Sequence, residues 1–281
     1  MLDAIPFDMP GPIPFVIVEG RAGAGVPARI LLDTGAAAPF PLIVSPGFAA
    51  RAGARFEALP ETAATGALGA APVAFRAARL ARFRLGPVAL DEVAVGVSGA
   101  VDAVGRQIGR EVDAVLGHHF LAGRTIAIDY ARRRLELRAT AGPDALAIRF
   151  TLAPGRPLTL VRVGLNGRGP FLMALDTGAS TTLLSPATAA AAGIEASEAA
   201  ALGGAGGAVA GGARLGRAEI RLGPLVRGNQ AVAVADVLEP VRAAAGAAIE
   251  GVLGADLFLS GRITIDYGTN RLWFAEGREE G

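Results

Sequence analysis

The sequence predicts an all-β protein with short helices, built as two similar lobes. Its 281 residues include 39 glycines and 18 prolines, and valine and leucine are abundant. This composition favours many short strands joined by turns. The second half of the chain repeats the order of motifs in the first half at a distance of about 140 residues. That period is the length of a domain and not of a solenoid repeat.

Composition and charge exclude several classes of partner and site. Cysteine is absent, which excludes disulfides, a thiol nucleophile and a cysteine-ligated metal. The net charge of +1 gives no electrostatic reason to expect nucleic acid or a membrane surface as a partner. The first fifteen residues are rich in proline and contain no Lys or Arg, and no long apolar run follows. We therefore expect no signal peptide and no membrane span, and a cytoplasmic protein, or a periplasmic one if a leader was removed.

Each repeat begins with a hairpin whose second strand runs into Asp-Thr-Gly. The strands are expected at 15–18 and 29–32 in the first repeat, and at 158–165 and 171–175 in the second. Asn166-Gly167 is a strong hairpin signal, and short apolar runs predict buried strands. An Asp at the end of such a strand costs free energy unless it is paired or hydrogen-bonded. Asp33 and Asp176 therefore suggest two carboxylates brought together for acid–base chemistry.

A Ser-Pro pair follows each motif and predicts the start of a short helix. Ser45-Pro46 begins a helix that ends near Gly53, and Ser185-Pro186 begins one that ends at Gly193. Segments rich in Gly and Ala come next, at 65–71 and 202–212. Each lies between strand-like stretches, so each is expected to form the tip of a hairpin.

The end of each repeat matches best. The pairs are Leu85-Gly86-Pro87-Val88 with Leu222-Gly223-Pro224-Leu225, Val115-Leu116-Gly117 with Val252-Leu253-Gly254, and 126–130 with 263–267. The two copies are 137 residues apart from Leu85 onward, against 143 at the Asp-Thr-Gly motifs, so the first copy carries six extra residues before Leu85. Gly142 and Pro143 mark a linker at 140–145, which divides the chain into lobes at 1–140 and 146–281.

Two Asp-Thr-Gly motifs, each followed about eighty residues later by an apolar-Gly block, resemble the pepsin/retropepsin superfamily of aspartic proteases. The bacterial retropepsin-like group is the closer match, because each half is short and its motif reads Asp-Thr-Gly-Ala. The resemblance covers residues 13–276. It implies a bilobal acid protease fold in which each lobe supplies one Asp to a site between the lobes. Because both lobes lie on one chain, as in pepsin, a monomer is possible.

The resemblance also implies roles for individual residues. Asp33 and Asp176 would form a catalytic dyad that holds one proton as a unit, so neither can be assigned as the base. Thr34 and Thr177 would hydrogen-bond across the lobe interface. The remaining residues expected to support the active-site loops are Gly35, Gly178, Ser180, Leu116, Gly117, Leu253 and Gly254. The flap residues expected to contact substrate are Gly66, Leu68, Gly69, Gly206 and Gly207.

The sequence departs from the family pattern at three points. Ala36 and Ala179 follow the motifs, where pepsin-like enzymes usually carry Ser or Thr. Ser180 occurs only in the second copy, so the surroundings of the two carboxylates are expected to differ. The only tyrosines, Tyr130 and Tyr267, lie in the closing strands, so a flap tyrosine of the pepsin type is absent and substrate preference should come from apolar pocket walls.

Other duplicated or paired polar residues are more simply explained without catalysis. Asp129 and Asp266 each precede a Tyr and a polar turn, and we expect hairpin or surface residues. His118-His119 is expected to be a half-exposed pair, because adjacent residues point in different directions and no other His or Cys exists to complete a zinc site. We expect no metal and no cofactor.

The sequence thus predicts an aspartic endopeptidase acting on a peptide or protein through a water activated by Asp33 and Asp176. Two alternatives remain open. One is a peptide-binding or weakly active pseudo-protease of the same fold. The other is a protease of narrow specificity that processes one partner or itself.

Overall fold

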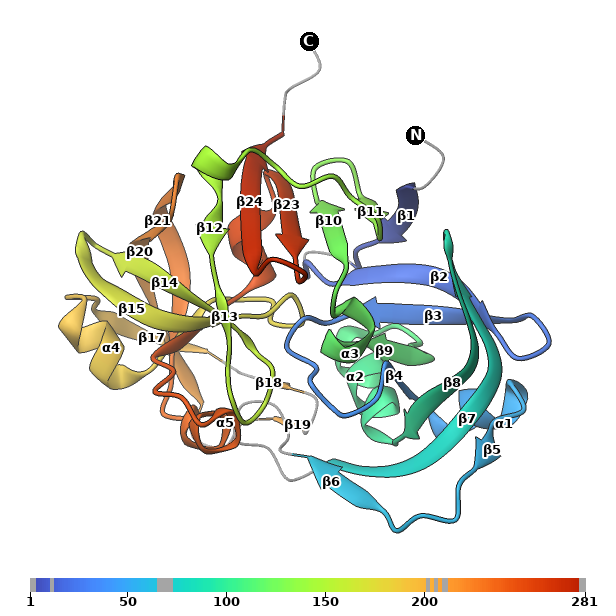
Figure 1. Ribbon diagram of the computed structural model, residues 1–281. Helices are drawn as coiled ribbons and strands as arrows, with labels where there is room; N and C mark the ends of the chain where they lie inside the picture. Colours follow the sequence, from blue (N-terminus) through green and yellow to red (C-terminus); the bar gives the residue numbers. More distant parts are fainter. Residues whose placement is uncertain are drawn as a thin grey trace.

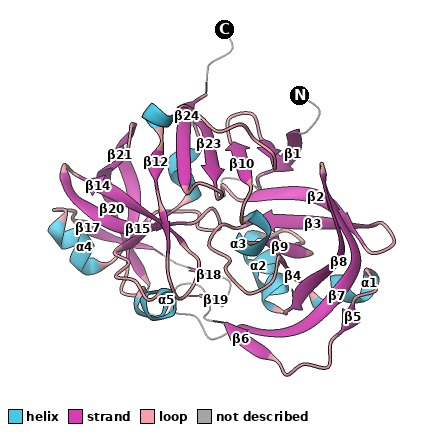
Figure 2. Ribbon diagram, in the orientation of Figure 1, coloured by secondary structure: helices cyan, strands magenta, loops and turns pink. Residues whose placement is uncertain are grey.

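A computed structural model describes residues 4–10, 13–64, 73–200, 203–204, 207–208 and 212–277 of the chain. Strands are the main regular structure of both lobes, and short helices lie around them (Figures 1 and 2). The all-β, two-lobed class predicted from the repeat is confirmed. Within the described residues, no helix is long and apolar enough to cross a membrane.

Each lobe contains a closed barrel of six strands with the same order of pairing. The first barrel runs through β2 (Val16–Ala22), β3 (Val26–Leu32), β9 (Ala114–Leu116), β4 (Leu42–Val44), β8 (Val88–Val97) and β7 (Val73–Leu85), and β7 pairs with β2 to close it. The second runs through β14 (Thr159–Leu165), β15 (Arg168–Leu175), β22 (Gly251–Leu253), β16 (Leu183–Leu184), β21 (Leu225–Val234) and β20 (Ala213–Leu222), closed by β14 with β20. Closure removes the sheet edges and encloses the apolar side of each strand.

A third sheet joins the two lobes. Its strands, in order, are β1 (Ala4–Asp8), β11 (Arg134–Glu136), β10 (Thr125–Asp129), β23 (Gly261–Asp266), β24 (Arg271–Glu276) and β12 (Ile148–Arg149). At its centre β10 and β23 are antiparallel, with Ala127 opposite Thr264. These two residues occupy equivalent positions in the two repeats, so the pseudo-two-fold axis passes between them. The isoleucines around this point, Ile126, Ile128, Ile263 and Ile265, are fully buried and tie the lobes together through apolar burial.

The predicted turns and helix starts form as expected. Asn166 and Gly167 have φ of +48° and +71° in the turn between β14 and β15, a left-handed pair that suits a tight hairpin. Helices α1 (Pro46–Arg51) and α4 (Pro186–Ala191) begin after Ser45 and Ser185, whose hydroxyls each accept a hydrogen bond from a backbone N–H of the first turn. A 3-10 turn, η2 (Asp144–Leu146), begins within the segment predicted to link the lobes and ends one residue beyond it.

Two longer helices and the joining sheet were not predicted. Helices α2 (Ala100–Ile108) and α5 (Glu239–Ala245) occupy equivalent places in the two repeats. Shorter helical turns, α3 (His118–Leu121) and η3 (Ala255–Phe258), follow the two apolar-Gly blocks. The remaining strands are β5 (Arg55–Phe56), β6 (Thr62–Ala64), β13 (Thr151–Leu152), β17 (Ala196–Ala200), β18 (Gly203–Gly204) and β19 (Gly207–Ala208).

Candidate active site

The two Asp-Thr-Gly motifs follow equivalent strands in the two barrels. Asp33 comes directly after β3 and Asp176 directly after β15, and both strands pair in parallel with the strand of their own apolar-Gly block. The Asp33 N–H donates to the Leu116 carbonyl at 3.0 Å, and the Asp176 N–H donates to the Leu253 carbonyl at 2.9 Å. The sheet ladder thus continues through each Asp, which fixes where its side chain emerges.

Thr34 and Thr177 join the two loops by four reciprocal hydrogen bonds. The Thr34 hydroxyl accepts from the Thr177 N–H at 3.0 Å and donates to the Leu175 carbonyl at 3.3 Å. The Thr177 hydroxyl accepts from the Thr34 N–H at 3.1 Å and donates to the Leu32 carbonyl at 3.2 Å. Thr34 is 1% exposed and Thr177 is 0% exposed. Because water cannot reach these groups, no water molecule could substitute for a partner if one of the four bonds were lost.

The glycine of each motif lies against the carboxylate of the other. A Cβ on Gly35 would stand 2.4 Å from Cγ of Asp176, and one on Gly178 would stand 2.5 Å from Cγ of Asp33. Each glycine N–H also donates to its own Asp Oδ1, at 2.8 Å for Gly35 and 2.7 Å for Gly178. Only a residue without a side chain lets the loops approach this closely, and the approach brings the two carboxylates together.

The two carboxyl groups interact directly and are half-buried between the lobes. Burial raises the pKa of Asp33 well above its usual range. The negative charge of Asp176 and a hydrogen bond with its side chain raise that pKa further, against the Gly35 and Ala36 N–H groups, which lower it. A carboxyl group with a raised pKa beside a second carboxylate can hold a proton where an ordinary Asp is ionised.

Behind the loops, the apolar-Gly blocks make the contacts that their sequence suggested. A Cβ on Gly117 would stand 2.1 Å from the Ala36 carbonyl oxygen, and one on Gly254 would stand 3.0 Å from that of Ala179. The same two carbonyls accept the N–H of the next residue in each block, His118 at 2.8 Å and Ala255 at 2.9 Å. The blocks therefore hold the motif loops by backbone contact.

The surroundings of the two carboxylates differ, though not where the sequence indicated. Ser180 makes no hydrogen bond with any described residue. Instead, the Ala36 N–H gives Asp33 Oδ1 a second hydrogen bond at 2.9 Å. Arg156, in the loop between β13 and β14, donates from Nη2 to the Gly35 carbonyl across the lobe interface at 3.1 Å.

Arg156 brings a positive charge near the pair. Burial lowers the pKa of its guanidinium, and the charges of Asp33 and Asp176 oppose that effect. The first repeat has Ile13 at the corresponding position. Sequence analysis missed Arg156, and its only signal was the lack of a counterpart in the first repeat.

Two tyrosines feel the charge of the carboxylate pair, and a further buried carboxyl group, Asp256, acts in turn on Tyr130. Sequence analysis assigned none of these three residues to the site. Tyr130 and Tyr267 are buried, and burial together with the charge of Asp176 raises the pKa of both. Burial also raises the pKa of Asp256, which accepts hydrogen bonds from Thr182 and Gln230. The duplication of the two tyrosines could have drawn attention to them.

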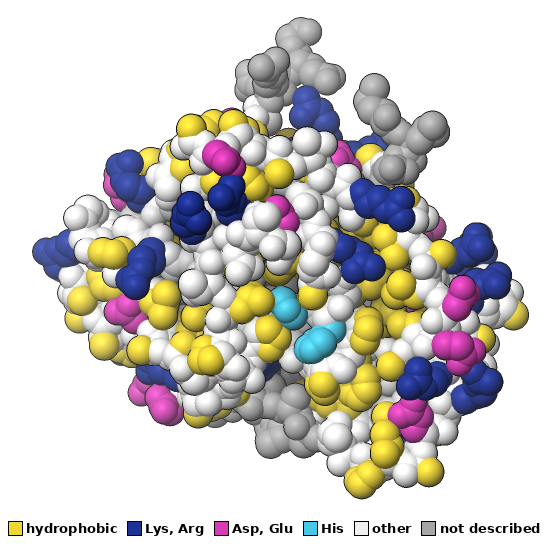
Figure 3. Space-filling model, in the orientation of Figure 1, with side chains coloured by type: hydrophobic (Ala, Val, Ile, Leu, Met, Phe, Trp, Pro, Cys, Tyr) yellow, Lys and Arg dark blue, Asp and Glu magenta, His cyan; other side chains and the backbone are white. Residues whose placement is uncertain are grey.

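The polar residues that the sequence set apart from catalysis have other surroundings than Asp33 and Asp176. They are Asp129, Asp266 and the histidine pair. Asp129 accepts from the Arg132 N–H and Asp266 from the Gly268 and Thr269 N–H groups, so both cap hairpin turns as expected, although both are buried. The histidine pair was expected to be half-exposed, but His118 is buried against Tyr267 and His119 is exposed. Figure 3 shows one face of the molecule, with histidine side chains near its middle among hydrophobic side chains.

The expected flap residues lie mainly outside the described residues. Gly66, Leu68, Gly69 and Gly206 are not described, and Gly207 lies in β19, which pairs with β18. No group of three or more potential metal ligands occurs among the residues that are described.

Comparison with known proteins assigns the chain to a family. A family model described as aspartyl protease matches residues 18–120 and again 161–257. The two matches cover more than half of the chain, and each contains one Asp-Thr-Gly motif and its apolar-Gly block. A search of curated proteins found no match. The chain, with two copies of this unit, belongs to the aspartyl protease family.

Proposed function

We propose that the protein is an aspartic endopeptidase in which Asp33 and Asp176 act as one catalytic dyad. The observation that carries the proposal is the reciprocal packing of Gly35 and Gly178 against the two carboxylates. It gives one site shared by two lobes, which we divide at the linker of residues 140–145. Neither lobe supplies such a pair alone.

The reaction follows from a pair of carboxyl groups that holds one proton. The ionised carboxylate takes a proton from a bound water, which attacks the peptide carbonyl carbon. The protonated carboxyl group donates its proton to the oxyanion that develops. Proton transfer to the amide nitrogen then releases the amine. The raised pKa of Asp33 supports a neutral acid at this position over part of the pH range, although the pair titrates as a unit.

The substrate of this reaction would be an extended peptide bound between the lobes. Backbone hydrogen bonds of the kind made between strands would hold it, with side chains in apolar pockets. Thr34 and Thr177 would keep the carboxylates in position while the substrate binds, and Gly117 and Gly254 would support the loops from behind. The flap residues named above would cover the peptide.

A peptide library tests the proposal. The wild-type protein, Asp33→Asn and Asp176→Asn are each incubated with the library between about pH 3 and 7, with cleavage detected by mass spectrometry. Asp91→Asn, in an exposed stretch of β8, is the matched control. We expect a bell-shaped pH profile and a loss of about 100- to 10,000-fold in both site variants, with none in the control.

Two other outcomes distinguish the alternatives. Peptide binding without cleavage, unchanged by either Asn substitution, would contradict the proposal and favour a pseudo-protease. Cleavage of a single sequence among many, still abolished by both substitutions, would support the dyad and identify a processing enzyme of narrow specificity.

A further inference from the structure

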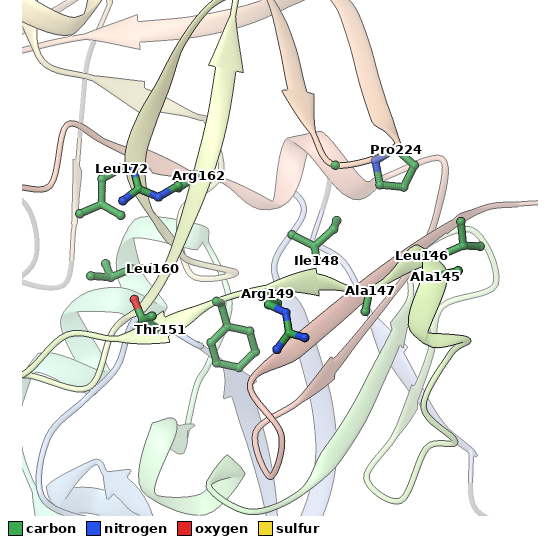
Figure 4. A pocket seen from close by; sticks show the side chains of 12 residues that line it. Ala145, Leu146, Ala147, Ile148, Arg149, Thr151, Leu160, Arg162, Leu172 and Pro224 are labelled. Carbon is green, nitrogen blue, oxygen red and sulfur yellow. The ribbon is translucent and has the colours of Figure 1, made fainter.

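A cavity of about 670 Å³ lies in the second lobe, outside the candidate active site (Figure 4). One wall is the chain from the linker through β12 to β13, and the opposite wall is formed by β14 and β15. The Gly223-Pro224 turn between β20 and β21 borders it, where a Cβ on Gly223 would stand 2.5 Å from Ile148. The volume is within the range of sites that bind small molecules or a few residues of peptide.

The walls are apolar. Phe150 and Leu160 are buried, Leu172 and Ile148 are half-buried, and Leu146 is 55% exposed. A large aliphatic side chain with that exposure costs free energy unless something covers it. No Asp or Glu lines the cavity among the residues that the structure describes.

Two arginines give this apolar cavity a positive charge. Arg149 comes from β12 and Arg162 from β14, and Figure 4 shows both among the lining side chains. Arg149 lies opposite Arg271 in the ladder with β24, an arrangement of like charges that is unfavourable. Asp144 forms an ion pair with Arg271, whereas neither the Arg149 nor the Arg162 guanidinium has a hydrogen bond or ion pair with any described residue.

The wall at β12 also has an open strand edge. In the ladder, β12 pairs only with β24. The Phe150 N–H donates to the Asn270 carbonyl at 3.1 Å, and the alternation of an antiparallel ladder then directs the N–H and C=O of Arg149 away from β24. A free strand edge of this kind can pair with an extended peptide.

We propose that this cavity is a second binding site, for an apolar peptide that ends in a free C-terminal carboxylate. The apolar walls accept apolar side chains, and the negative charge that such a peptide carries is its terminal carboxylate. The two guanidinium groups match that charge, and the edge of β12 matches the peptide backbone. The site is separate from the dyad, and binding to it does not depend on the proposed cleavage.

The test is a binding measurement on the full chain with both Asp33→Asn and Asp176→Asn, so that it does not depend on hydrolysis. The probe is a fluorescein-labelled pentapeptide of Leu, Val and Phe with a free C-terminus, followed by fluorescence anisotropy. The same peptide with a C-terminal amide is the paired ligand. Intrinsic fluorescence of Trp273, the only tryptophan and a residue of β24 next to β12, gives a second readout with unlabelled peptide.

We expect the free acid to bind at least about tenfold more tightly than the amide, because charge-assisted hydrogen bonds to guanidinium are lost in the amide. Arg149→Gln and Arg162→Gln should each weaken binding of the acid by about the same factor. Arg84→Gln, an exposed arginine of the first lobe, should not. All three arginines are exposed, so equal melting temperatures would show that the variants fold alike.

Three outcomes would overturn the proposal. They are equal affinity for acid and amide, affinity that is unchanged in Arg149→Gln and Arg162→Gln, and displacement of the probe by decanoate as effectively as by the unlabelled peptide acid. The last would show that the cavity recognises an alkyl carboxylate and not a peptide.

Discussion

Replacement of Thr34 by valine removes one hydroxyl from the lobe interface and keeps the shape of the side chain. The change deletes the hydrogen bond to the Leu175 carbonyl and leaves the Thr177 N–H without its acceptor. A lost hydrogen bond costs about 0.5–1.5 kcal/mol, and a buried unpaired donor costs about 1–3 kcal/mol. Since Thr34 is 1% exposed, water cannot replace the partner. We expect the free energy of unfolding to fall by about 1.5–4.5 kcal/mol.

Urea titration followed by circular dichroism measures this loss, and Thr188→Val is the matched control. Thr188 is also buried, and its hydroxyl contacts the Glu250 carbonyl at 2.8 Å and the Ser185 hydroxyl at 2.7 Å, all within the second lobe. Both variants should lose stability to a similar degree. Only Thr34→Val should also lose peptide cleavage, by about 100-fold, because it loosens the contact that aligns the two carboxylates. Stability within about 0.5 kcal/mol of wild type, or equal cleavage by the two variants, would show that the Thr34 hydroxyl does not hold the two loops together.

Three further predictions concern the same loops. Folding raises the pKa of Asp33, so ionisation of this carboxyl group destabilises the folded protein as pH rises. Asp33→Asn should therefore raise the melting temperature at pH 7 more than at pH 4. An equal shift at both pH values would contradict this. Gly35→Ala places a Cβ 2.4 Å from Cγ of Asp176 and should abolish cleavage, whereas Gly99→Ala, with nothing within 4 Å, should not; an active Gly35→Ala protein would show that the loops are not packed as described. Arg156→Gln removes a positive charge that lies near the two carboxyl groups, so both limbs of the pH–rate profile should move to higher pH. Arg156→Lys keeps the charge and should stay nearer to wild type. An unmoved profile would rule out an electrostatic role for Arg156.

The elements predicted correctly from sequence are those with local signals. Asn166-Gly167 suits a left-handed turn, Ser45-Pro46 and Ser185-Pro186 suit the start of a helix, and the apolar runs before each Asp suit buried strands. The duplication then indicated that two motifs, each weak alone, belong to one candidate site. Each of these signals is contained in a few neighbouring residues, or in their recurrence at a fixed distance.

The helices that were missed lack a start signal. Gly99 and Leu238 precede α2 and α5, and neither offers a side chain that caps the first turn. Their ends carry the stronger signal, because Gly109 and Gly246 both adopt the left-handed conformation that closes a helix. A prediction that weighted helix ends as much as helix starts would have found them.

The joining sheet and the asymmetry of the site depend on contacts between distant residues. β1 pairs with β11, and β12 with β24, across more than 100 residues, so no local pattern indicates the pairing. Arg156 reaches Gly35 across the lobe interface in the same way. Ser180 was the expected source of asymmetry because it differs between the repeats, but a difference in sequence does not show which residue reaches the carboxylates.

The proposed activity requires that Asp33 and Asp176 form one titrating unit between the lobes. The most direct measurement is a ¹³C NMR titration of the aspartate carboxyl carbons in wild type, Asp33→Asn and Asp176→Asn. We expect the Asp33 carboxyl to titrate well above the usual range of an aspartate. Its pKa should fall in Asp176→Asn, because a charge and a hydrogen bond are removed while burial remains. An Asp33 carboxyl that titrates at the usual pKa, or one whose titration is the same with and without Asp176, would contradict it.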